Sequence, residues 1–149
     1  MLKESEKASK VDNAGTEKKS SKLSKAEKRY EAVHMYDAEV VNGGHSQYFG
    51  NSSGGDYRQA IEGLREINAL KKSAILEEAV QVFGSKGPPK DWEKRRKLVY
   101  SFSEEQQNFL DGLNDRYYAS EENVAMLLVL YEVDHNHAPR SIPTVDELA

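Results

Sequence analysis

Apolar side chains recur every three or four residues through most of the chain after residue 23, which is the spacing of one face of an α-helix. The clearest stripe joins Tyr57, Ala60, Ile61, Leu64 and Ile67. No segment alternates strictly between apolar and polar residues, as a half-buried strand would. The pattern therefore predicts an all-α fold: a single-domain compact helical bundle of about six or seven helices.

Short-range signals place the helix ends. Ser24 with Glu27, and Ser103 with Gln106, have the form of a capping box, in which each side chain bonds to the backbone N–H of the other residue. The last helix has almost no polar side, so we expect it to be the most enclosed. The expected helices cover residues 24–41, 45–51, 56–70, 73–83, 92–102, 103–117 and 120–134.

Two further caps and two glycines complete these boundaries. Asp56 and Ser120 precede apolar stripes and are expected to cap the helices that follow. Gly43 and Gly44 are expected to end the first helix, because glycine adopts positive φ without steric cost.

Charge and composition divide the chain. Residues 1–28 hold eight Lys and five acidic residues, a net charge of +3, whereas residues 29–149 hold 13 basic and 20 acidic residues, a net charge of −7. Residues 1–23 have few apolar side chains to offset an ordering cost of about 1–2 kcal/mol per residue. We therefore predict a disordered Lys/Ser-rich tail over residues 1–23, a helical domain over 24–138 and a C-terminal extension over 139–149.

Composition also excludes several classes of function. The chain has no cysteine, so a disulfide framework and a thiolate metal site are impossible, and we expect no metal and no cofactor. It has no apolar run long enough for a membrane span and no signal-peptide core at its start, which predicts a cytoplasmic protein without a membrane partner. The acidity of the larger part argues against direct nucleic-acid binding by the folded domain, because phosphate binding needs a cationic surface.

A polar junction surrounds the glycine pair, and it can be interpreted in two ways. In the first, its carboxylate and amides bond to freed backbone groups and to one another, and Asn42 caps residues 45–51. In the second, it forms a small-molecule-binding or enzymatic site, with His45 and Tyr48 as exposed contacts. Turn and cap chemistry explains most of these residues, which favours the first interpretation. The candidate residues are Glu39, Asn42, Gly43, Gly44, Gln47, Tyr48, Phe49 and Asn51.

The same residues carry a family resemblance. The order of Glu39, the Asn-Gly-Gly triplet, Gln-Tyr-Phe and Asn51 resembles the signature of a bacterial helical family whose namesake is a DNA-mimic protein. Segments 60–70, 79–83 and 109–118 resemble later family elements, so the resemblance covers about residues 29–134. Two positions depart from the family pattern: His45 stands where an aromatic or aliphatic residue is common, and Asn68 stands where a glycine usually ends a helix. The resemblance implies an all-α fold, no established enzymatic activity for most members and, in the namesake, an acidic surface that occupies a DNA-binding protein.

Acidic residues near the end of the chain supply the partner hypothesis. Glu104, Asp111 and Asp115 share one helical face, at rises of about 10 Å and 6 Å along the axis. Glu121 and Glu122 extend this row if the last two helices lie side by side. The row is sparser than the one charge per ~1.7 Å of duplex DNA, so an ordinary solvated helix face is the competing interpretation. We hypothesise a non-enzymatic protein-interaction module whose protein partner could be a DNA-binding protein, with a homodimer left open.

Overall fold

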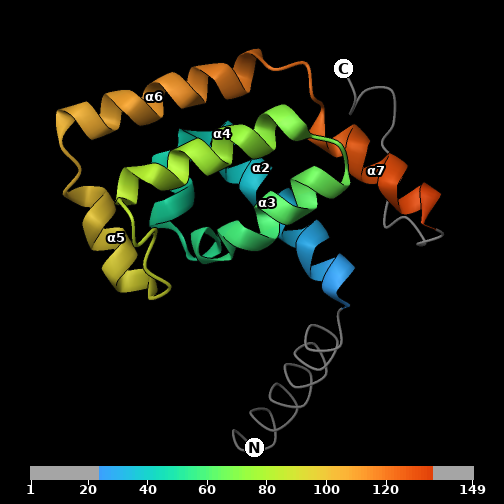
Figure 1. The fold of residues 1–149 in the computed structure, drawn as a ribbon, viewed down its shortest axis with the longest axis horizontal. Coiled ribbons are helices and arrows are strands. Elements are labelled where there is room, and N and C mark those ends of the chain that lie inside the picture. Colours follow the sequence, from blue (N-terminus) through green and yellow to red (C-terminus); the bar gives the residue numbers. More distant parts are fainter. Residues whose placement is uncertain (1–23, 136–149) are drawn as a thin grey trace, which may run out of the picture.

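The computed structural model describes residues 24–135, and within them it contains helices and no strand (Figure 1). The α-helices are α2 (Lys25–Gly50), α3 (Tyr57–Glu66), α4 (Leu70–Val80), α5 (Trp92–Tyr100), α6 (Glu104–Ala119) and α7 (Val124–Asp134). Two 3₁₀ turns, η1 (Ser52–Asp56) and η2 (Gln81–Phe83), follow α2 and α4. The predicted all-α class is confirmed. The predicted tail and C-terminal extension, residues 1–23 and 139–149, lie outside the described residues.

The central helix is α2, which contacts α3, α5, α6, α7 and η1. Val33, Tyr36 and Val40 lie on its inward face and are fully buried. The prediction that the last helix is the most enclosed is wrong: α7 lies at one end of the molecule, and its Leu130 and Val133 are half exposed. An apolar sequence shows how much surface a helix could bury, but not how many neighbours the fold gives it.

The capping boxes at Ser24 and Ser103 are both present, as predicted. The other two caps are wrong. Asp56 makes no capping hydrogen bond, because η1 runs directly into α3. Asn123, not Ser120, caps α7, since its side-chain oxygen accepts a hydrogen bond from the backbone N–H of Met126 at 3.0 Å.

Helix α3 ends four residues earlier than expected, at Glu66, in a turn that contains Asn68. Asn68 has a φ of 66°, in the left-handed region that glycine adopts most easily and asparagine tolerates. Asparagine at this position therefore permits a turn with positive φ without a glycine.

The glycine pair does interrupt the first helix, although helical structure resumes at once. Gly44 has φ 80° and ψ −176°, so α2 consists of two helical parts joined by a kink. A Cβ atom on Gly44 would lie 2.4 Å from the side-chain nitrogen of Asn114 on α6. Both the positive φ and the close approach of α6 therefore require glycine at this position.

Candidate functional site

Glu39 holds the two parts of α2 together across the kink. Its Oε2 atom accepts one hydrogen bond from Gln47 Nε2 and one from Asn51 Nδ2, each at 2.8 Å. A Cβ atom on Gly43 would lie 1.9 Å from the side-chain oxygen of Gln47, so this packing leaves no room for a side chain there. The carboxylate and the two amides are thus hydrogen-bonded to one another, as the first interpretation of the junction predicts.

Asn42 does not have the predicted capping role. It is exposed, and within residues 24–135 its side chain makes no hydrogen bond. The second part of α2 instead continues directly from the kink.

His45 is fully buried, so the prediction that it is an exposed contact is wrong. Its backbone N–H and its Nδ1 atom both face the Oδ1 of Asn114, at 2.9 Å and 2.6 Å, and its Nε2 lies 2.7 Å from the hydroxyl of Tyr36. Because an amide oxygen can only accept, Nδ1 carries the proton and Nε2 accepts from Tyr36. Burial lowers the pKa of His45 to about 4, although the hydrogen bond to Asn114 opposes the shift.

Tyr48 is also fully buried, so the prediction that it is an exposed contact is wrong too. Its ring packs edge-on against Tyr36 with centroids 4.8 Å apart, and the neighbouring Phe49 packs against Phe83 at 5.0 Å. Burial, and secondarily the Asp56 carboxylate, raise the pKa of Tyr48. The kink turns positions 45, 48 and 49 toward the core, which the sequence motif alone could not show.

Arg95 supports the junction from α5, and sequence reasoning assigned it no role. It is almost completely buried, and its guanidinium donates to five backbone carbonyl oxygens at 2.8–3.3 Å. The only available signal was its place among Trp92, Val99 and Phe102 on the apolar stripe of this segment. The five carbonyls belong to Phe49, Asn51, Ser52, Pro89 and Lys90.

The predicted acidic residues fall into two groups. Glu104, Asp111 and Asp115 are exposed on α6, and Glu121 is exposed in the loop before α7. Glu122 is half-buried, and its two carboxylate oxygens accept hydrogen bonds from the backbone N–H groups of Lys71 and Lys72 at 2.9 Å and 2.7 Å. It therefore caps the start of α4, while the other four side chains face solvent.

A polar cluster lies beneath this cap. The hydroxyl of Tyr117 donates a hydrogen bond to Asp37, and the Lys72 ammonium lies 4.1 Å from the centroid of the Tyr117 ring. Burial lowers the pKa of Lys72, while Asp37 and Glu122 oppose that shift. The cluster explains how the first helix tolerates Asp37 on an otherwise apolar face.

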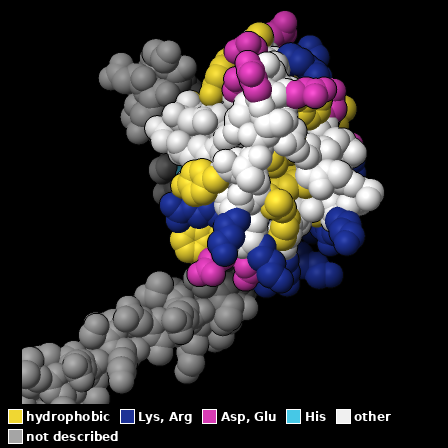
Figure 2. Space-filling view, turned by 90° about the vertical axis from the view of Figure 1, so that its left-hand side faces the viewer, with side chains coloured by type: hydrophobic (Ala, Val, Ile, Leu, Met, Phe, Trp, Pro, Cys, Tyr) yellow, Lys and Arg dark blue, Asp and Glu magenta, His cyan; other side chains and the backbone are white. Residues whose placement is uncertain are grey.

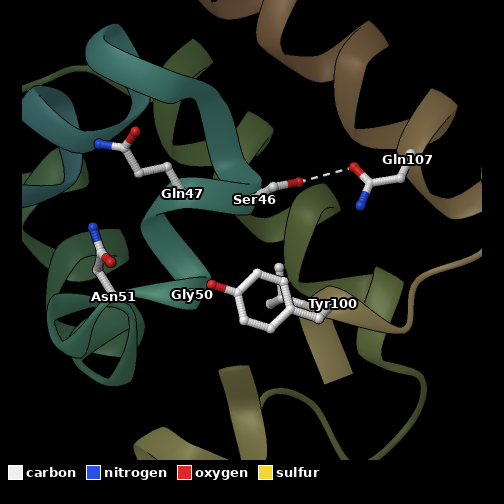
Figure 3. A pocket seen from close by; sticks show the side chains of 7 residues that line it. Ser46, Gln47, Gly50, Asn51, Tyr100 and Gln107 are labelled. Carbon is white, nitrogen blue, oxygen red and sulfur yellow. Dashed lines mark hydrogen bonds between the residues drawn. The ribbon is translucent and has the colours of Figure 1, made fainter. Parts of the chain in front are cut away.

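An open pocket of about 400 Å³ lies on the outer side of the junction (Figure 3). The outward-facing residues of the second part of α2 form one wall, and α5 and α6 supply the others. The hydroxyl of Ser46 donates to the side-chain oxygen of Gln107 at 3.0 Å across the pocket. The pocket is lined by Ser46, Gln47, Gly50, Asn51, Val99, Tyr100 and Gln107.

The junction and the helices around it fall within a known family. Residues 21–136 match the family of DMP19-like proteins. The chain belongs to the DMP19-like family. This is the DNA-mimic family that the sequence motif resembles, so the predicted resemblance is confirmed. Comparisons with curated proteins and with solved structures find no match.

Membership in the DMP19-like family is consistent with a role in protein interaction, and the family is not a known enzyme family. Within residues 24–135, no group of three or more His, Asp or Glu side chains is arranged to hold a metal ion. None of the helices in the same range is both long enough and apolar enough to cross a membrane.

Proposed function

We propose that this DMP19-like protein is a non-enzymatic protein-interaction module that regulates a DNA-binding protein by occupying its DNA-binding surface. The observation that carries this proposal is the concentration of negative charge at one end of the chain. Residues 101–135 contain eight acidic residues and one basic residue, a net charge of −7, whereas residues 24–85 contain nine acidic and seven basic residues, a net charge of −2.

The arrangement of α6 supports the same function. The helix lies along one edge of the molecule (Figure 1), and Glu104, Asp111 and Asp115 are exposed on one of its faces. None of the three forms an ion pair with another described residue. A cationic DNA-binding surface could therefore meet these carboxylates without first displacing a basic residue of this chain.

The experiment is affinity capture from a lysate of the native cell, with the full chain as bait. Captured DNA-binding proteins should be released by excess duplex DNA and should bind more weakly as salt rises. The variant Glu104→Gln/Asp111→Asn/Asp115→Asn should lose affinity by about tenfold or more, since it removes three charges that would face the cationic surface.

A second triple variant provides a matched control. Glu31, Glu62 and Glu93 are exposed on other helices, and changing each to Gln removes the same total charge. That control should keep most of the affinity. Equal losses in both variants would show only a net-charge effect, and a partner that binds DNA and this protein together would exclude competition for the DNA-binding surface.

A second candidate function is small-molecule binding at the Asn42–Asn51 junction, and the pocket beside Gln47 and Asn51 favours it. The burial of His45 counts against the enzymatic version, because a general base must reach its substrate. A thermal-shift screen with metabolites tests this function. Stabilisation that Gln47→Ala abolishes would support it.

A further inference from the structure

A basic surface on α5 contrasts with the acidity of the rest of the described chain. Residues 86–100 contain six basic and two acidic residues, a net charge of +4. Figure 2 shows most Lys and Arg side chains gathered with hydrophobic side chains over the lower part of one face, where a few Asp and Glu side chains also lie, and further Asp and Glu side chains near its upper edge. Of the two acidic residues, Asp91 caps α5 by accepting a hydrogen bond from the backbone N–H of Lys94 at 2.9 Å. Glu93 is exposed beside the basic residues.

Three exposed side chains form a ladder along this helix, at positions four residues apart. The Arg96 guanidinium lies 5.7 Å from the centroid of the Trp92 ring and 5.4 Å from that of Tyr100. Its Nε and Nη2 atoms donate to the Tyr100 hydroxyl at 3.2 Å and 3.0 Å, while Trp92 donates to the carbonyl of Gly50 at 2.8 Å. The ladder is therefore held in place before any partner binds, which lowers the entropy cost of binding.

The two aromatic side chains of the ladder are largely exposed to solvent. Tyr100 is 74% exposed and Trp92 45% exposed. The Nη1 atom of Arg96 makes no hydrogen bond within residues 24–135, so it can donate to an incoming anion. Exposed Trp, Tyr and Arg side chains are the types that most often dominate the binding energy of protein interfaces.

The ladder also borders the open pocket. Tyr100 belongs to both, and the pocket adds three side-chain amides, from Gln47, Asn51 and Gln107. The Gln47 and Asn51 nitrogens already donate to Glu39, and the Gln107 oxygen accepts from Ser46. The Gln47 and Asn51 oxygens and the Gln107 nitrogen can therefore bond to a peptide backbone. An apolar side chain could enter the pocket between Val99 and Tyr100 while neighbouring carboxylates meet Arg96 and the lysines of α5. Figure 3 shows the labelled side chains around this pocket.

We propose that the ladder and its pocket bind a short acidic peptide segment of a protein partner, with one apolar side chain of that segment in the pocket. A peptide fits better than a nucleic acid for two reasons. Arg96 lies over the rings of both Trp92 and Tyr100, so it covers one face of each ring on which a base would stack. The basic helix is only about 13 Å long, and the acidic residues Glu104 and Glu105 begin the next helix, so a longer polyanion would be repelled.

The charged part of this surface lies on α5, whereas the acidic residues Glu104, Asp111 and Asp115 lie on α6, which contributes only Gln107 to the pocket lining. The surface would therefore bind a partner of opposite charge. The test uses the full chain and a phage-displayed library of random short peptides. We expect enrichment of sequences in which acidic residues flank an aliphatic or aromatic residue. An enriched peptide, a charge-reversed version of it and a short thymidine oligonucleotide are then titrated by fluorescence anisotropy.

Two exposed residues provide the decisive variants. Tyr100→Ala should weaken peptide binding by at least about fivefold, as expected for an aromatic anchor. Arg96→Gln should weaken it by about three- to fivefold and reduce its salt dependence. The matched control is Lys71→Gln, which removes an exposed positive charge from the first turn of α4, away from α5. It should leave affinity unchanged, and thermal denaturation confirms that each variant is folded.

Several results would overturn the proposal. One is the absence of acidic sequences among the enriched peptides. Another is peptide binding by Tyr100→Ala that is as tight as binding by the unchanged protein. The third is tighter binding of the oligonucleotide than of the peptide. A free metabolite that fills the pocket and is not displaced by the peptide would favour the small-molecule function instead. The Glu104/Asp111/Asp115 variant should retain peptide binding, so failure of the α6 proposal can be distinguished from failure of this one.

Discussion

His45 shows how one residue makes stability depend on pH. Its imidazole is buried between two neutral partners, Tyr36 and Asn114, so the folded protein holds it in the neutral form. The pKa of His45 falls from 6.5 to about 4 on folding. Between these values the unfolded chain binds more protons than the folded chain, so the contribution of this residue to stability is lost as pH falls below about 6.5.

We predict that the free energy of unfolding decreases by about 2 kcal/mol between pH 8 and pH 5 through His45 alone. Urea denaturation across this pH range measures the change. The His45→Phe variant, which replaces the imidazole with an aromatic ring that does not titrate, should lose this part of the pH dependence. NMR titration of the ring provides an independent measurement. A His45 ring that titrates near pH 6.5 in the folded protein would contradict the prediction.

Burial of individual polar residues was the least predictable property of the sequence. His45 and Tyr48 follow two glycines and look suited to an exposed turn, but the direction of the kink carries both into the core. Arg95 lies in a run of charged residues that resembles a solvated helix, yet it is almost completely buried. For His45 and Arg95 the deciding contact is with a segment more than forty residues away, and a local pattern does not contain that information.

At the scale of helices, the kink in α2 is the feature that arranges its neighbours. Gly44 combines a positive φ with the close approach of Asn114 from α6. We predict that Gly44→Ala destabilises the protein by about 2 kcal/mol or more, from backbone strain and the displaced Asn114. Chemical denaturation measures the change.

Gly112 provides the matched control for this substitution. It lies within α6, and a Cβ atom there would have no neighbour within 4 Å. Gly112→Ala should stabilise the protein by about 0.5–1 kcal/mol, because alanine favours the helix and loses less backbone entropy on folding. A destabilised Gly112→Ala variant, or an unaffected Gly44→Ala variant, would show that the two glycines are not distinguished by backbone conformation.

Helices could be predicted from the sequence where their signals were local. The two capping boxes depend on residues three positions apart, and both are present. The caps predicted at Asp56 and Ser120 failed because neighbouring structure replaced them: a 3₁₀ turn in the first case and the Asn123 cap in the second. The cap of α4 could not be predicted, because Glu122 accepts hydrogen bonds from the backbone N–H groups of Lys71 and Lys72, about fifty residues earlier in the sequence.

At the scale of the whole molecule, the net charge of the sequence conceals two surfaces of opposite sign. The net charge of −7 over residues 29–149 predicts one acidic domain, whereas α5 and its preceding loop are basic and the segment after them is strongly acidic. The two surfaces meet on the face shown in Figure 2. A molecule of this kind can attract a cationic partner to the exposed carboxylates of α6 and an anionic partner to the basic side chains of α5.

Arg95 is the residue on which the arrangement of these surfaces depends. Its guanidinium joins the end of α2, the η1 turn and the loop before α5, so it fixes the basic helix against the kinked one. An ammonium group has three donors and cannot reproduce the five-carbonyl contact. We predict that Arg95→Lys lowers the free energy of unfolding by about 3 kcal/mol or more, because buried carbonyls lose their donors. Urea denaturation followed by circular dichroism measures the change.

The adjacent Arg96 provides a matched control for this prediction, because it has the same side chain in the same helix but is exposed. Arg96→Lys should change stability by no more than about 0.5 kcal/mol. If the loss at Arg95 came from helix propensity or net charge, the two variants would behave alike, since both substitutions keep the charge and lysine is also a good helix former. A large loss of stability confined to Arg95→Lys would therefore show that the hydrogen bonds to the carbonyls fix the position of α5, with its ladder and the pocket, relative to α2.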